Sequence, residues 1–258
     1  MTAVTDLLCT VARPDDESFG LGSLLAGAVA AGARVVLVCA TRGEAGEDHT
    51  GLGRTGDVLG AAREQELRAA AAELGVAEIE VLGFADSGWD GPARANALVS
   101  AGEALVTAVH HALARHRPRV VVTLDPTGSD GHRDHAAIGA ATTTAFARHG
   151  DATTLYHWCL LRSVMDRWVA ERGGDAGVYA SPRLGRPDGD ITTVVDGEAV
   201  LDVRRRAIAA HASQASPFLG LSSDLEAAFL TQDHLVRVVP PWPDGPREQT
   251  LTGLFPTH

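Results

Sequence analysis

Short apolar runs alternate with Ala-rich helical patterns along most of the chain, and this alternation constrains the fold more than any other feature. The runs from Leu7 to Ala12, from Arg34 to Ala40 and from Val120 to Leu124 have the length and composition of buried strands. Strands that alternate with helices are typical of a parallel sheet wrapped by helices. The sequence therefore predicts an α/β fold with a mainly parallel sheet and helices on both faces.

The same pattern predicts further elements. Helices are expected at residues 21–31, 58–74, 94–116, 134–148 and 199–211, and strands at 78–82, 155–161 and 234–239. Beyond Glu171 the pattern loosens into Gly, Pro and Asp clusters, and no internal repeat or linker is found. Because 258 residues with 45% hydrophobic content are enough to bury a full core, we expect a single domain over residues 1–258.

Charge and cysteine content exclude several classes of function. A net charge of −11 and a pI near 5.4 argue against a nucleic-acid or anionic-membrane partner. Cys9, Cys39 and Cys159 have no CxxC spacing, so they are expected to be buried core thiols. No apolar run approaches the ~20 residues of a membrane span, and the first residues lack a basic segment followed by an apolar run. We expect a cytoplasmic protein with a small-molecule partner, and homo-oligomerisation is left open.

Two polar clusters stand at the ends of predicted strands. Residues 13–17 read Arg-Pro-Asp-Asp-Glu, and residues 131–135 read Gly-His-Arg-Asp-His. Taken alone, an acidic run before a helix is commonly a cap, and two such histidines are commonly surface residues. Ligands of open α/β sheets bind outside the carboxyl ends of the strands, so we expect the two clusters to meet over one crevice.

Together the clusters resemble the motifs of the LmbE-like or PIG-L-like zinc-dependent N-deacetylases of N-acetylglucosaminyl conjugates, which read Ala-His-Pro-Asp-Asp-Glu and His-Pro-Asp-His. Three weaker signals follow in family order, at residues 41–44, 63–75 and 207–214. The resemblance covers about residues 6 to 214. It implies a Rossmann-like fold and a hydrolase that removes an N-acetyl group from an N-acetylated amino sugar, or related glycoside, by metal-activated water.

The resemblance also implies roles for individual residues. Asp16 and His135 would be zinc ligands, and Asp15 would be the base that activates water. His132 would stabilise the oxyanion or protonate the leaving amine, and Asp134 would orient His132.

Arg13 stands where the family motif has a histidine that would be the third ligand. Arginine has five donors, no acceptor and a permanent charge, so it cannot coordinate zinc. Two unit charges ~4 Å apart interact by ~4 kcal/mol at an effective dielectric of 20, and a divalent ion would meet roughly twice that repulsion. We therefore expect a weakened zinc site, with Arg13 either turned onto Asp16 or extended out of the crevice.

Glu44, Arg63 and His211 are candidates for substrate binding by the same resemblance. Each has an alternative interpretation: Glu44 as a loop residue, Arg63 as an ion-pair partner of Glu64 or Glu66, and His211 as helix-end packing. The loops at 43–57, 84–94 and 175–190 are expected to choose the substrate.

Two further functions remain open beside the deacetylase. Arg13 itself favours a catalytically silent homologue that binds a glycoside or a protein partner. A nucleotide-binding Rossmann-like protein is disfavoured, because residues 13–18 stand where the G-x-G-x-x-G turn should be.

Overall fold

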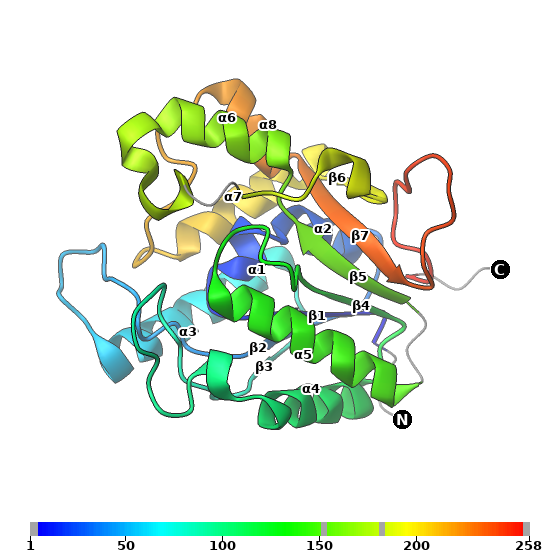
Figure 1. Cartoon of the computed structure of the whole chain (residues 1–258), viewed down its shortest axis with the longest axis horizontal. Coiled ribbons are helices and arrows are strands. Elements are labelled where there is room, and N and C mark those ends of the chain that lie inside the picture. Colours follow the sequence, from blue (N-terminus) through cyan, green and yellow to red (C-terminus); the bar gives the residue numbers. More distant parts are fainter. Residues whose placement is uncertain (1–4, 151–153, 181–183, 255–258) are drawn as a thin grey trace.

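A seven-stranded sheet forms the centre of the protein in the computed structural model, which describes residues 5–150, 154–180 and 184–254 (Figure 1). The strand order is β3-β2-β1-β4-β5-β7-β6. The strands are β1 (Leu7–Val11), β2 (Val35–Cys39), β3 (Glu78–Val81), β4 (Val120–Leu124), β5 (Thr154–Cys159), β6 (Thr193–Asp196) and β7 (Gln232–Val239).

The sheet is parallel from β3 through β5, and only β7 runs antiparallel to its two neighbours. The mainly parallel sheet predicted from the sequence is confirmed, whereas β6 was not predicted. The strand order reverses between β1 and β4, which lie side by side. In open α/β sheets such a reversal leaves a crevice outside the carboxyl ends of the strands.

Helices cover both faces of the sheet (Figure 1). They are α1 (Asp16–Phe19), α2 (Gly22–Ala30), α3 (Gly56–Leu74), α4 (Glu103–His116), α5 (Arg133–His149), α6 (Arg162–Arg172), α7 (Leu201–Ala210) and α8 (Ser223–Leu230). Short 3-10 helices occur at Leu98–Ser100, Gly173–Ala180, Asp188–Asp190 and Glu198–Val200. Helix α4 packs on α5, α3 on α7, and α6 on α8. Across the ranges that the structure describes, no helix is both long and apolar enough to cross a membrane.

The helical predictions need three corrections. Helices α6 and α8 were not predicted. The helix expected at 94–116 begins only at Glu103. Gly102 before it has a φ of 49°, a left-handed conformation that glycine adopts readily and that ends the preceding 3-10 turn.

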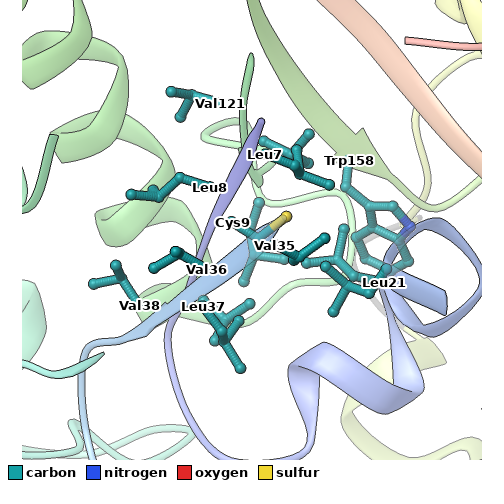
Figure 2. Close-up of a cluster of buried hydrophobic side chains, with 14 of the residues drawn as sticks. Leu7, Leu8, Cys9, Leu21, Val35, Val36, Leu37, Val38, Val121 and Trp158 are labelled. Atoms are coloured by element: carbon teal, nitrogen blue, oxygen red, sulfur yellow. The ribbon is translucent and has the colours of Figure 1, made fainter. Parts of the chain in front are cut away.

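The core lies where the central strands are covered on both faces. All five residues of β1 and all five of β2 are buried, and Figure 2 shows Leu7, Leu8 and Cys9 beside the valines of β2. Continuous apolar strands of this kind suit a parallel sheet with helices on both sides. The three cysteines are free and buried, as predicted.

Arg204 of α7 links the end of α1 to strand β7. Its side chain is fully buried and donates to the carbonyl oxygens of Ser18 (3.1 Å), Phe19 (2.6 Å) and Gly20 (2.9 Å). These carbonyls end the short helix α1 and have no helical partners. The guanidinium also lies 3.4 Å from the Asp233 carboxylate on β7, so a single charged group fixes α1, α7 and β7 together.

We expect Arg204→Met to destabilise the protein by about 3–5 kcal/mol, because the buried Asp233 loses its counter-charge and three carbonyls lose their donors. Arg205→Met on the same helix is the matched control, since Arg205 is exposed and pairs with Glu226 on the surface. Urea unfolding followed by circular dichroism measures both. Equal stability of the two variants would contradict this role for Arg204.

Candidate active site

The two sequence clusters meet at the carboxyl ends of β1 and β4. Asp15 and Asp16 lie just after β1, and His132 and His135 lie at the start of α5, which follows β4. His135 Nε2 is 3.0 Å from Asp16 Oδ1, although 119 residues separate them in sequence. The predicted convergence of the clusters is thus confirmed.

Asp15 has a strained backbone that Glu17 holds in place. Its φ of 112° lies in a region that residues with a Cβ rarely adopt, and such strain concentrates at functional sites. The Asp15 N–H donates to Glu17 Oε2 (3.0 Å), and Glu17 Oε1 lies 2.5 Å from His211 Nε2. Burial would lower the pKa of His211, but the Glu17 carboxylate raises it. The buried Glu17–His211 pair therefore holds the backbone of Asp15 in this conformation.

The Asp15 carboxyl group itself lies at the edge of a cavity. Burial raises its pKa to about 7, although Arg13 acts in the opposite direction. A carboxyl group with such a pKa exchanges protons near neutrality. This property suits a general base or acid.

Asp16 is held as a carboxylate by backbone and side-chain donors. Its Oδ2 accepts from the N–H groups of Ala12 (2.9 Å) and Arg13 (3.0 Å), which leaves Oδ1 to face His135. Burial would raise the pKa of Asp16, but His135 and then Arg13 hold it well below its usual range.

His135 lies between two carboxylates. Its Nε2 faces Asp16 and its Nδ1 contacts Asp130 Oδ2. Burial would lower the pKa of His135, yet Asp130 and Asp16 raise it to about 10. The ring is therefore an imidazolium that pairs with both carboxylates.

Arg13 points into the site. Its Nη1 is 2.6 Å from His132 Nε2, while its Nε is 3.5 Å from Asp15 Oδ1 and 3.9 Å from Asp16 Oδ1. Of the two orientations expected from the sequence, the inward one is observed. The inward side chain nevertheless approaches His132 more closely than Asp16.

His132 is the N-cap of α5, and its Nδ1 accepts from the Asp134 backbone N–H at 3.1 Å. Burial and then Arg13 lower the pKa of His132 to about 2, so the ring is neutral. A neutral imidazole has one acceptor nitrogen. The helix cap and Arg13 therefore compete for the acceptor of this ring.

The Asp134 carboxylate does not contact His132, contrary to the expectation that it would orient this ring. Its Oδ2 accepts from the Ser87 N–H at 2.9 Å. The ring of His132 folds back onto the first turn of α5, so the backbone of Asp134 makes the contact instead. Asp134 thereby fixes the loop after β3 against α5.

These side chains do not fit a zinc ion held by three protein ligands. Zinc requires three His, Cys, Asp or Glu side chains that converge at about 2.0–2.3 Å. No such group of three that could hold a metal ion occurs in the ranges 5–150, 154–180 and 184–254. Asp16 and His135 pair with each other, and at position 13 a permanent cation contacts His132.

A cavity of about 140 Å³ adjoins the cluster, with Arg13, Asp15, Asp16 and His135 at its edge. The three candidate substrate residues do not line it. Glu44 accepts from the Asp86 N–H (2.8 Å), and His211 contacts Glu17. Each holds a segment near the site in place.

Arg63 is the third of these candidates, and its expected ion pair with Glu64 or Glu66 is not formed. Its guanidinium donates to the carbonyl oxygens of Gly43 (2.6 Å) and Glu47 (3.1 Å). The side chain is buried beneath the loop after β2, which brings it within reach of carbonyl oxygens rather than of the helix surface.

Sequence reasoning missed two features of the site. The first is Asp130, which contacts His135 Nδ1 and raises the pKa of that ring. Only its position two residues before His132 could have indicated this role. The second feature is the cavity wall, whose aromatic residues come from α1, β5, α6, α8 and the segment before α8, and for which the motifs hold no signal.

Fold and site thus define an α/β protein with paired carboxylates and histidines at the reversal of strand order. A family model described as PIG-L, GlcNAc-PI de-N-acetylase, matches residues 8–146, and the chain belongs to this family. A 1D-myo-inositol 2-acetamido-2-deoxy-alpha-D-glucopyranoside deacetylase of Rhodococcus opacus (strain B4) is 36% identical, with 90% of this chain and 91% of the relative covered.

Two solved structures show the same fold at low sequence identity. N,N'-diacetylchitobiose deacetylase from Pyrococcus horikoshii has a TM-score of 0.61 at 18% identity, with 90% of this chain and 82% of that chain covered. GalB, a 4-carboxy-2-hydroxymuconate hydratase from Pseudomonas putida KT2440, has a TM-score of 0.62 at 18% identity, with 93% and 98% covered. The fold therefore supports more than one chemistry, and function must be argued from the site.

We expect His211→Leu to destabilise the protein by about 3–5 kcal/mol, because the fully buried Glu17 loses its charged partner. The exposed His111→Leu is the matched control and should leave stability nearly unchanged. Thermal unfolding measures both. If the two variants unfold alike, the Glu17–His211 pair does not support the turn at Asp15.

Proposed function

We propose that this chain is a hydrolase that removes the N-acetyl group from an N-acetylated amino-sugar conjugate. The observation that carries the proposal is the convergence of Asp15, Asp16, His132 and His135 beside a cavity, in a chain similar along 90% of its length to a deacetylase of such a conjugate.

Amide hydrolysis needs a base for the attacking water, positive charge near the carbonyl oxygen and a proton for the departing amine. Asp15 is the base, since it lies at the cavity edge with a pKa of about 7. Arg13 supplies positive charge beside Asp15. His132 serves the departing amine only when Arg13 releases its Nε2.

The contact between Arg13 and His132 favours a second candidate, a catalytically silent homologue that binds an N-acetylated glycoside. At 2.6 Å, Arg13 Nη1 contacts His132 Nε2, the nitrogen through which this ring would serve the departing amine. In this case the cavity keeps its ligand but the site cannot turn it over. Measured release of free amine separates the two candidates.

We expect Arg13→His to raise zinc affinity by roughly a hundredfold or more. The substitution removes a fixed charge worth ~4 kcal/mol per unit charge at ~4 Å and adds a neutral nitrogen ligand. Zinc content after dialysis, together with amine release from N-acetylglucosaminyl-inositol, measures the effect. The parent should hydrolyse slowly and be insensitive to a chelator, whereas the variant should become faster and zinc-dependent.

Arg13→Gln is the matched control, because it removes the charge without adding a histidine ligand. It should raise zinc affinity less than Arg13→His does. Full zinc occupancy of the parent at micromolar metal, with brisk hydrolysis that Arg13→His does not improve, would contradict our view of position 13. No amine release by any of these proteins would support the silent homologue.

In the Arg13→His background, Asp15→Asn and His135→Ala should fail in different ways. Asp15→Asn should lower turnover about a hundredfold or more and leave zinc bound, because it removes a base. His135→Ala should lose zinc and turnover together. Equal and mild effects of both substitutions on turnover would indicate a binding protein instead.

A further inference from the structure

The cavity beside the site has an aromatic wall that begins within the site itself. Phe19 lies on the same short helix as Asp16 and packs edge-on against Phe218, with ring centroids 5.8 Å apart. Phe218 in turn packs against Phe229 of α8, at 5.6 Å. The wall therefore runs without a break from α1 to α8.

Two tryptophans complete the cavity and turn only their apolar surfaces toward it. The indole N–H of Trp158 faces Asp233 Oδ1 (3.4 Å), and that of Trp168 donates to the Pro217 carbonyl (3.2 Å). Both polar atoms are thus directed into the protein. No hydroxyl or amide side chain is among the described residues that line the cavity.

A ligand in this cavity meets polar groups at one end only. Arg13, Asp15, Asp16, Asp130 and His135 form that end, and hydrophobic side chains form nearly all of the remaining walls. A polyol placed against those walls would leave hydroxyl groups without partners, which is unfavourable. The cavity volume of about 140 Å³ is close to the ~150 Å³ of an apolar protein cavity that accepts benzene.

We propose that this cavity takes an apolar group about the size of a six-membered ring, attached close to the amide of the substrate. The proposal rests on the proposed function, because it names the substrate class of the same site. The apolar group is either the N-acyl group or the aglycone. In both cases the cavity selects against a polyol such as the myo-inositol in the name of the Rhodococcus opacus relative.

The loops expected to choose the substrate do not form these walls. No described residue of 43–57, 84–94 or 175–190 lines the cavity, and residues 181–183 lie outside the described residues. The walls come instead from α1, β5, α6 and residues 217–229. Selectivity for the apolar group thus comes from β5, from helices α1, α6 and α8, and from the segment before α8.

Binding can be measured without turnover, because Trp158 and Trp168 report on the cavity. Stopped-flow tryptophan fluorescence of the parent protein is recorded with four ligands. They are methyl N-acetylglucosaminide as baseline, its benzyl glycoside, its N-benzoyl analogue and N-acetylglucosaminyl-inositol. We expect the benzyl or the N-benzoyl ligand to bind roughly tenfold to a hundredfold more tightly than the baseline. The arm that gains affinity identifies the source of the apolar group.

Phe218→Ala and Phe229→Ala should each reduce this preference to within about threefold. Phe84→Ala, a half-buried phenylalanine that packs on the main core and does not line the cavity, should leave it unchanged. The proposal would be overturned if the baseline ligand or the inositol ligand bound as tightly as both aromatic ligands. Amine release is scored separately, so aromatic preference without hydrolysis would refute the proposed function and leave this selectivity standing.

Discussion

The turn between β1 and α2 is the constraint on which the site depends. Within it Asp15 adopts a φ of 112°, at a cost of order 1–3 kcal/mol for a residue with a side chain. The turn persists because buried groups hold it from several directions. Asp16 accepts two backbone N–H groups, Glu17 accepts the N–H of Asp15, and Arg204 binds three carbonyl oxygens at the end of α1.

Arg13 fits this site because the surrounding charges balance it. The guanidinium and the imidazolium of His135 carry two positive charges, and Asp16 and Asp130 carry two negative charges. Asp15, with a pKa of about 7, adds a charge only in part at neutrality. A divalent metal ion would displace the proton of His135, so the permanent charge of Arg13 is what opposes such an ion at this site. The arginine also supplies no ligand atom.

The sequence predicted the sheet and the meeting of the two clusters, because both follow from apolar periodicity and from the geometry of parallel strand ends. It did not predict that Arg13 would contact His132 or that His135 would pair with Asp130. Those contacts depend on side-chain directions across 119 and five residues, which spacing alone does not determine. Arg63 shows the same limit, since burial directed it to loop carbonyls rather than to a neighbouring glutamate.

The polar residues of the site and the apolar residues of the cavity wall lie mostly in different parts of the sequence. The family match covers residues 8–146, which contain all of Arg13, Asp15, Asp16, His132 and His135. Most of the cavity wall, from Trp158 to Phe229, lies beyond that match. Strand ends fix the first set, whereas the second set comes from β5, from α6 and α8, which pack on each other, and from the segment before α8. The two sets thus come mostly from different stretches of the sequence, so a substitution at position 13 leaves most of the apolar wall unchanged.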